Sequence, residues 1–386
     1  MTVPEARPEV ENLQAYSAPL EGRRGMLRLD FNENTVGPSP QVVEALRAIP
    51  AEQIAIYPEY DGLREAFIAN LSAQHSAFRH ASGASALAQP LAPEQIGLFN
   101  GVDAAIHALF HAYGDRGDTL LTTSPTFGYY APCARMQGMT IEAIPYRLRD
   151  FAFPLEEIRA ALTEPGGSTT AQRPPRLLLI CNPNNPTGTR LAPPPILELA
   201  AAAPETLVVI DELYEAFTGD SVLPCADFAA TPNLVVLRSL AKTAGLAGLR
   251  MGFAIGAAPL IDRISRVTGP YDINSFAVTA AHAALADQAY TDSYVAEVIR
   301  ARGWLLPRLQ AAGVRHHAAG GNYLLIWPER PEEVEQALRA TGILVRSMAG
   351  KPLIDGSLRV SLGTCAQMER FWAAYQGIAA DRQKPG

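Results

Sequence analysis

The chain has 386 residues, enough for two or three domains and for a large core that needs no disulfide or structural metal. Its formal net charge is −7, with 48% hydrophobic and 18% charged residues, and this balance excludes intrinsic disorder, collagen and coiled coil for the whole chain. No block of Lys or Arg is longer than the pair Arg23-Arg24, which disfavours a nucleic-acid partner.

The four cysteines are scattered and contain no CxxC pair, so we expect reduced thiols rather than a disulfide framework or a metal site. The polar, Pro-rich start lacks the apolar core of a signal peptide. No run approaches the roughly 18 apolar residues of a membrane span. We therefore expect a cytoplasmic protein without a membrane partner.

Residues 1–29 show no strong periodicity and are expected to form an N-terminal arm. From about residue 90 to 260, short β-branched runs that end in polar residues alternate with longer Ala/Leu-rich runs. The strand-like runs are QIGLFN, DTLLTT, RLLLIC, TLVVID, NLVVLRSL and RMGFAIG. Strands separated by helices predict a mainly parallel sheet covered on both faces, in an α/β large domain over residues 30–267.

The pattern changes after residue 268. A helix-like stretch at 276–312 is followed by YLLIWP, a helix from residue 331, ILVR and SLRVSL. This order predicts a smaller α+β domain over residues 268–386. Two further stretches, 81–93 and 164–175, are rich in small residues, Gly or Pro and predict surface loops.

Four short motifs carry most of the polar residues that follow the predicted strands. They are NPNNPTG at 182–188, DELY at 211–214, SLAK at 239–242 with Gly245, Gly248 and Arg250 behind it, and SLRVSLGT at 357–364. Each motif alone is weak, because NPTG can be a simple turn and an Asp after a strand can be a helix cap. Their order and spacing together are highly specific, and chemistry in parallel sheets collects at the carboxyl ends of strands.

With these motifs the chain resembles the fold-type I aminotransferases of class I/II, which depend on pyridoxal phosphate. Within that family it is most similar to the histidinol-phosphate aminotransferases. The resemblance extends from Tyr16 to about Tyr375. It implies a large domain with a mainly parallel seven-stranded sheet, a smaller α+β domain, and a homodimer with shared active sites.

The resemblance assigns the catalytic roles to residues of the types that this chemistry needs. Lys242 would form a Schiff base with the aldehyde cofactor and then move a proton as general base and acid. Asp211 would keep the pyridine nitrogen protonated, so that the ring can accept electrons. Tyr214 and Asn185 would hydrogen-bond the 3-oxygen of the ring, and Phe127 would stack on the ring face.

The cofactor phosphate needs backbone N–H groups and fixed positive charge, which a helix start and an arginine supply. The resemblance assigns this phosphate to Gly101, Val102 and Asp103 at a helix start, to Ser239 and Arg250, and to Tyr57 from the partner subunit. Two positions depart from the family pattern. Ala104 stands where the family usually has Glu, and Ala241 removes the second hydroxyl of the phosphate site.

Substrate recognition is assigned in the same way. Arg359 would bind the α-carboxylate of the substrate, because the planar guanidinium fits a carboxylate. Arg346 matches the further arginine that binds the substrate phosphate in the histidinol-phosphate group, and Tyr16 lies near the same phosphate in that group. Asn34 matches a position at the entrance of the site, and Asn322 matches another pocket-facing position.

Several alternatives stay open. Within the family they are an aromatic aminotransferase acting on phenylalanine, tyrosine or prephenate, and a decarboxylase of the threonine-phosphate type. Outside catalysis, the alternative is a silent cofactor-binding or regulatory module, against which the presence of Lys242 speaks. His107 and His111 lie four residues apart on one predicted helix, but no third ligand is in register, so we expect no metal site there.

Overall fold

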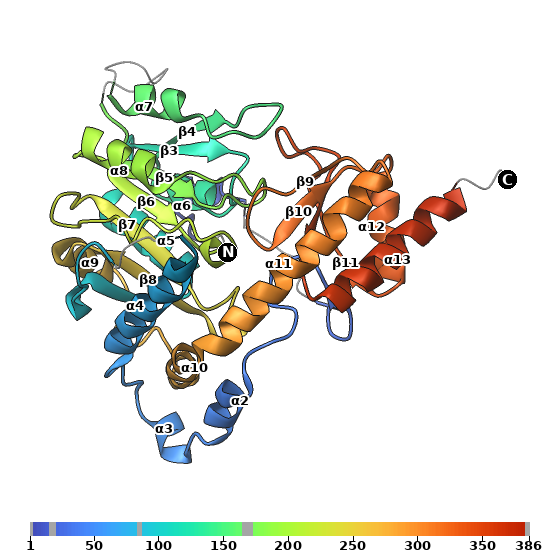
Figure 1. The fold of residues 1–386 in the computed structure, drawn as a ribbon. Helices are drawn as coiled ribbons and strands as arrows, with labels where there is room; N and C mark the ends of the chain where they lie inside the picture. The colour runs from blue at the N-terminus through green and yellow to red at the C-terminus, as the bar shows by residue number, and fades with distance from the viewer. Residues whose placement is uncertain (1–2, 15–20, 83–86, 164–172, 383–386) are drawn as a thin grey trace.

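The computed structural model describes residues 3–14, 21–82, 87–163 and 173–382 (Figure 1). Tyr16 lies outside the described residues, as do most of the predicted loop 164–175 and part of the predicted loop 81–93. None of the described helices is both long and apolar enough to cross a membrane.

A seven-stranded sheet forms the larger body of the molecule. Its strands are β2 (Ile96–Asn100), β3 (Thr119–Ser124), β4 (Thr140–Pro145), β5 (Leu177–Cys181), β6 (Leu207–Asp211), β7 (Leu234–Ser239) and β8 (Met251–Gly256). They lie in the order β2-β8-β7-β6-β5-β3-β4, and β8 runs antiparallel to both its neighbours while the other pairings are parallel. The predicted mainly parallel seven-stranded sheet is thereby confirmed.

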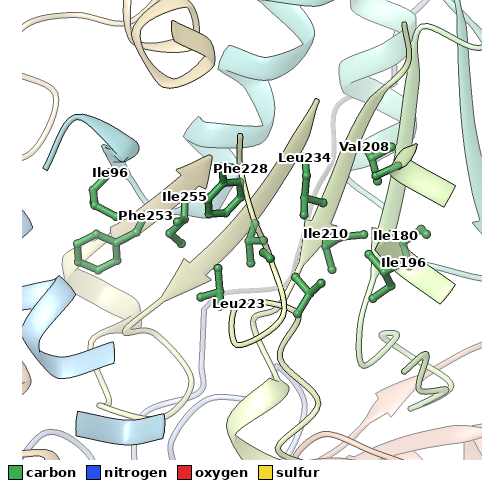
Figure 2. Close-up of a cluster of buried hydrophobic side chains, with 14 of the residues drawn as sticks. Ile96, Ile180, Ile196, Val208, Ile210, Leu223, Phe228, Leu234, Phe253 and Ile255 are labelled. Carbon is green, nitrogen blue, oxygen red and sulfur yellow. The ribbon is translucent and has the colours of Figure 1, made fainter. Parts of the chain in front are cut away.

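Both faces of the central strands of this sheet are covered, because successive strand residues point to opposite sides and most of them are apolar. On one face Val208, Ile210 and Leu234 join a buried cluster that α4 (Leu63–Ser82), α7 (Leu155–Thr163) and α8 (Pro193–Ala202) also enter (Figure 2). On the other face the alternate residues Val209 and Val235 pack with α5 (Val102–Tyr113), α6 (Tyr130–Met136) and α9 (Ala258–Ser265). The polar chemistry is therefore displaced from the sheet faces to the strand ends.

The smaller body holds a four-stranded antiparallel sheet in the order β12-β13-β10-β9. Its elements are β9 (His316–His317), β10 (Tyr323–Ile326), α12 (Pro331–Ala340), β12 (Arg346–Ser347), β13 (Leu358–Ser361) and α13 (Cys365–Arg382). The short strand β1 (Leu27–Arg28) pairs in parallel with β11 (Ile343–Leu344), so residues 27–28 are attached to this body. The chain forms four further short elements before the first strand of the large sheet. They are α1 (Pro8–Glu11), α2 (Pro40–Arg47), α3 (Ala51–Ala55) and the 3₁₀ turn η1 (Pro93–Gln95).

The expected helix over 276–312 is two helices, α10 (Ser275–Ala286) and α11 (Gln288–Ala311), because the chain leaves helical geometry at Asp287 with φ −110° and ψ 53°. Helix α10 packs on α2 and α4 and shares the core of the large sheet. The long helix α11 continues toward the smaller body and packs on α13 (Figure 1). The predicted division at residues 267 and 268 stays a prediction, but this packing places α10 with the large sheet.

Candidate active site

The carboxyl ends of β5, β6 and β7 meet at one edge of the sheet and bring the predicted motifs together. Asp211, the last residue of β6, is 2% exposed and lies opposite Cys181 in the strand register. Its Oδ2 accepts a hydrogen bond of 2.6 Å from Tyr130 Oη, and its Oδ1 accepts one of 3.3 Å from the Leu213 N–H. Burial raises the pKa of Asp211 to about 6, and the Tyr130 and Leu213 hydrogen bonds oppose that rise.

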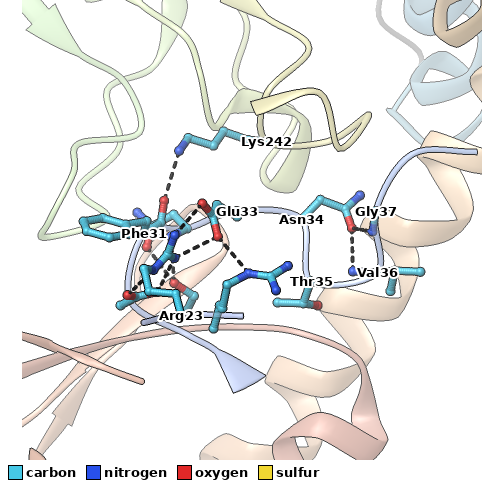
Figure 3. A network of polar contacts seen from close by, with 12 residues as sticks. Arg23, Phe31, Glu33, Asn34, Thr35, Val36, Gly37 and Lys242 are labelled. Atoms are coloured by element: carbon cyan, nitrogen blue, oxygen red, sulfur yellow. Dashed lines mark hydrogen bonds and ion pairs between the residues drawn. The ribbon is translucent and has the colours of Figure 1, made fainter. Parts of the chain in front are cut away.

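Lys242 follows β7 and reaches across the same edge. Its Nζ donates a hydrogen bond of 3.0 Å to the Phe31 carbonyl oxygen (Figure 3). Burial lowers the pKa of Lys242 to about 8, and the nearby Arg359 charge lowers it further. A larger fraction of this amine is therefore neutral near pH 7 than in an ordinary lysine, which is the condition for a nucleophilic amine.

Tyr214 lies beside these groups at the end of the DELY motif, and its hydroxyl oxygen is a shared acceptor. It receives hydrogen bonds from Asn185 Nδ2 at 3.3 Å and from Asn32 Nδ2 at 3.2 Å. The Asn185 Oδ1 in turn accepts a bond of 2.6 Å from Arg359 Nη1. Asn185, Tyr214 and Arg359 thus form one connected network, although they come from three separate motifs.

Asn32 is a member of this network that the sequence analysis missed. Its backbone is left-handed, with φ 55°, and its side chain also accepts from Ser361 Oγ at 2.9 Å. The repeated asparagines of Phe31-Asn32-Glu33-Asn34 were the available signal. The predicted Asn322 is fully buried and donates from Nδ2 to the Asn32 carbonyl at 3.1 Å, so it supports this segment.

Asn34, expected at the entrance of the site, hydrogen-bonds backbone groups of neighbouring segments. Its Oδ1 accepts from the N–H groups of Val36 and Gly37 at 2.8 and 2.9 Å (Figure 3). Its Nδ2 donates to the Thr243 carbonyl at 2.8 Å. It therefore fixes the turn at residues 34–37 to the loop that carries Lys242. It also lines a cavity of about 800 Å³, together with Ala241 of the SLAK motif.

Two arginines face each other across the small sheet. Arg346 on β12 is the register partner of Arg359 on β13, so the side chains leave the sheet on the same side. Arg359 is 8% exposed and donates from Nη2 to the Asp30 carbonyl at 2.6 Å. The Arg346 guanidinium lies 5.3 Å from the centre of the Phe31 ring, whose own carbonyl binds Lys242.

The start of α5 and the start of β8 form a narrow cradle. Gly101 has φ 80°, and a Cβ built on it would lie 2.6 Å from Arg250 Nη2. A Cβ on Gly252 would lie 2.6 Å from the Gly101 carbonyl carbon. Arg250 Nη2 binds Asp103 Oδ2 at 2.7 Å. Only glycines permit this approach of a guanidinium to a helix start, where N–H groups and the helix dipole favour an anion.

Ser239, Val102 and Phe127 border the same edge of the sheet. Ser239 Oγ donates to the Met251 carbonyl at 3.2 Å and accepts from the Ala241 N–H at 3.0 Å, so it shapes the loop that leads to Lys242. Val102 is the first residue of α5 and is buried. The Phe127 ring packs edge-on against Tyr130, with the two ring centres 5.5 Å apart.

Tyr57 is the predicted site residue that the fold leaves at the surface. It is 71% exposed and stacks on Tyr271, with the ring centres 4.1 Å apart. Among the described residues, no group of three or more His, Cys, Asp or Glu side chains could hold a metal ion.

Comparison with known proteins identifies the family. The model of the family "Aminotransferase class I and II" matches residues 24–374, and the chain belongs to this family. It is 32% identical to the histidinol-phosphate aminotransferase of Dinoroseobacter shibae over 98% of this chain and 100% of that protein. It is 33% identical to the histidinol-phosphate aminotransferase of Roseiflexus castenholzii over 97% of this chain and 98% of the relative.

Solved structures show the same fold. The structure of histidinol-phosphate aminotransferase from Sinorhizobium meliloti in complex with pyridoxal-5'-phosphate superposes with a TM-score of 0.81 at 22% identity. That similarity covers 98% of this chain and 99% of the other. The fold and the family are therefore fixed by independent comparisons.

Proposed function

We propose that this protein binds pyridoxal 5'-phosphate and transfers the amino group of histidinol phosphate to 2-oxoglutarate. The observation that carries the substrate assignment is the direct pairing of Arg346 with Arg359 across β12 and β13. Like charges opposite each other destabilise a sheet, so their presence favours an anionic ligand between or beside them. The names of the relatives support the same assignment.

The residues of the site fit the cofactor. The cradle that Gly101 and Gly252 leave open beside Arg250 suits the cofactor phosphate. The buried carboxylate of Asp211 suits the ring nitrogen of the cofactor. Tyr214 and Asn185 would hydrogen-bond its 3-oxygen. When bound, the cofactor supplies an aldehyde carbon that takes up the amino group and a ring that accepts electrons from the substrate.

The residues of the chain account for binding and proton transfer. The Lys242 amine, with its pKa lowered to about 8, can accept and return a proton at the substrate Cα close to neutral pH. Arg359 would orient a substrate carboxylate, since its Nη1 already binds Asn185 beside Tyr214. Asn32 and Asn185 hold the Tyr214 hydroxyl from two sides, which fixes its position during the reaction.

The two arginines would serve different anions. Glutamate, the product of 2-oxoglutarate, carries an α-carboxylate that would bind Arg359. Histidinol phosphate has no carboxylate, so its phosphate would bind Arg346 instead. An aromatic amino acid needs only the carboxylate contact, and the aromatic alternative is therefore an outcome of the same test.

The test compares kcat/KM for histidinol phosphate, phenylalanine, tyrosine and glutamate in the wild type and two variants. Arg346→Ala should lower the histidinol phosphate value by about 2–4 kcal/mol of transition-state binding, roughly 30- to 1,000-fold. Arg359→Ala should mainly harm glutamate. The control is Arg315→Ala, an exposed arginine that stacks on Trp327. Equal losses of kcat/KM for histidinol phosphate and for glutamate in either variant would reject the substrate assignment. A wild type that accepts only phenylalanine or tyrosine would reject it as well.

We also propose that the enzyme works as a homodimer. Apolar side chains that are at least one-third exposed gather at two segments near the stacked Tyr57 and Tyr271, namely Ile54, Ile56, Tyr57, Tyr271 and Phe276. Exposed apolar groups of this kind mark interaction surfaces, and a second copy of the chain would cover them. Tyr57 could then reach the phosphate cradle of the partner. Sedimentation should give twice 41.4 kDa, and a monomeric active enzyme would contradict the proposal.

We propose a cytoplasmic location. All four cysteines are free thiols, which suits a reducing compartment. Fractionation of cells that produce the tagged protein should recover it with cytoplasmic markers, and recovery with membranes or from the medium would contradict this.

A further inference from the structure

Tyr130 contacts the predicted catalytic carboxylate of Asp211 from the start of α6. It is the first residue of α6, 1% exposed, and its Oη donates to Asp211 Oδ2 at 2.6 Å. Its ring also meets Phe127 edge-on, with an interplanar angle of 82°. The start of α6 therefore supports both the residue expected to stack on the cofactor ring and the carboxylate expected to meet its nitrogen.

The hydrogen bond belongs to the strong class. An O–H group that donates to a carboxylate at 2.5–2.7 Å forms a charge-assisted bond, about twice as strong as a neutral one. The bond from the Leu213 N–H to the other carboxylate oxygen is longer, at 3.3 Å. Tyr130 is thus the closer of these two donors, and it fixes the rotation of the carboxylate about its Cβ–Cγ bond.

The direction of donation is fixed by the surroundings. Burial raises the pKa of Tyr130 well above its ordinary value, and the Asp211 and Cys181 charges raise it further, so the phenol keeps its proton. The other titratable groups that act on Asp211 are Lys242, which favours the ionised carboxylate, and Asp103, which opposes it. Among these groups, Tyr130 is the one with a short hydrogen bond to the carboxylate.

We propose that Tyr130 is a positioning residue, whose hydroxyl keeps the Asp211 carboxylate ionised and oriented toward the cofactor ring nitrogen. The inference rests on the proposed function, since it concerns how the chain receives pyridoxal phosphate. It predicts that the hydroxyl acts through Asp211 and not through the packing of the ring.

The test replaces Tyr130 by Phe, which removes one oxygen and keeps the ring. Loss of a hydrogen bond to a charged group predicts a dissociation constant for pyridoxal phosphate about 10- to 100-fold higher at pH 7.5. The midpoint of its pH dependence should move upward, because the carboxylate is easier to protonate, and kcat should fall more than KM rises. Titration of the apoenzyme with pyridoxal phosphate from pH 5.5 to 8.5 gives the first two values.

The matched control is Tyr146→Phe. Tyr146 is also buried, at 2% exposure, and its hydroxyl accepts from Thr123 Oγ1 at 2.9 Å. This variant should lose similar stability yet keep the wild-type affinity and pH profile. A second measurement removes Asp211 itself, because in the Asp211→Asn background Tyr130→Phe should change the affinity little.

The outcomes separate the inference from the proposed function. Wild-type affinity and pH profile in Tyr130→Phe would overturn the inference, and so would equal losses in Tyr130→Phe and Tyr146→Phe. Additive effects of Tyr130→Phe and Asp211→Asn would overturn it as well. A wild-type apoenzyme that does not bind pyridoxal phosphate would instead reject the proposed function.

Discussion

Replacement of Arg238 by Met removes the cation of a buried ionic cluster behind the site. Arg238 lies on β7 with its side chain 8% exposed, and its Nε is 3.0 Å from Oε2 of Glu212, which is 0% exposed. Its Nη1 also contacts the Glu215 carboxylate, and its Nη2 donates to Ser221 Oγ at 2.8 Å. One buried cation therefore serves two buried carboxylates.

The expected loss of unfolding free energy depends on the two buried carboxylates that Arg238→Met leaves without their cation. Breaking a buried ion pair by removing one partner typically costs about 3–5 kcal/mol, because the other charge stays buried and uncompensated. Glu212 would keep its bonds from the Val222 N–H at 2.7 Å and from Ser221 Oγ at 2.9 Å, which soften the loss. We expect the free energy of unfolding to fall by about 3 kcal/mol, at the lower end of this range.

The loss should depend on pH with a definite sign. Burial raises the pKa of Glu212 even with Arg238 present, and removal of the cation raises it further. A carboxyl whose pKa is raised by folding binds more protons in the folded chain than in the unfolded chain. Its contribution to stability is therefore full at a pH below its pKa in the unfolded chain, and it is lost as the pH rises through its pKa in the folded chain. The deficit of Arg238→Met should therefore grow as the pH rises above the ordinary pKa of a glutamate.

Urea unfolding at fixed protein concentration, at pH 5.5 and 8.0, measures the deficit. The matched control is Arg266→Met, which breaks the exposed pair with Asp262 and should cost less than about 1 kcal/mol at either pH. The triple variant with Glu212→Gln and Glu215→Gln should recover part of the loss. A deficit no larger than that of the control, or one that shrinks with rising pH, would refute the reasoning.

The remaining predictions concern catalysis and assembly. Lys242→Ala should abolish multiple-turnover transamination while the apoenzyme keeps its fold by circular dichroism, and measurable turnover would remove Lys242 from the catalytic role. Tyr57→Ala should also lose activity. Mixing these subunits with Lys242→Ala subunits should restore part of it after subunit exchange, because one site then combines its own Lys242 with an intact Tyr57 of the neighbour. No recovery after verified exchange would show that Tyr57 serves its own chain.

Most of the large sheet could be predicted because its central strands are buried on both faces, whereas the partly exposed edge strand β4 gave no such run. Runs such as RLLLIC and TLVVID are apolar at nearly every position, and they correspond to β5 and β6. Three of the site motifs could also be placed, since they stand at the ends of β5, β6 and β7 and parallel strands end at one edge. The fourth motif, at 357–364, contains β13 of the small antiparallel sheet, and its position beside the others depends on how the two bodies pack. The break between α10 and α11 was missed, because Asp287 sits in a sequence that is otherwise compatible with helix throughout.

The partners of the site residues could not be predicted in the same way. Tyr130 lies 81 residues from Asp211, and Asn32 lies 182 residues from Tyr214. Such contacts depend on where the fold brings two segments, and one sequence carries no record of them. Arg238 is different, because a charged residue inside the run NLVVLRSL indicates a buried cation that needs a partner.

The side chains of Asp211 and Glu212 leave the chain in opposite directions, because successive residues at a strand end point to opposite sides. Asp211 binds Tyr130, while Glu212 binds Arg238, and both carboxylates are almost fully buried. The loop that continues to Tyr214 and the 3₁₀ turn η2 (Glu215–Phe217) is held at Glu212 and again at Glu215. The ionic cluster therefore fixes both ends of the segment that presents Asp211 and Tyr214. Because of this, Arg238→Met should lower kcat as well as stability, whereas Arg266→Met should lower neither.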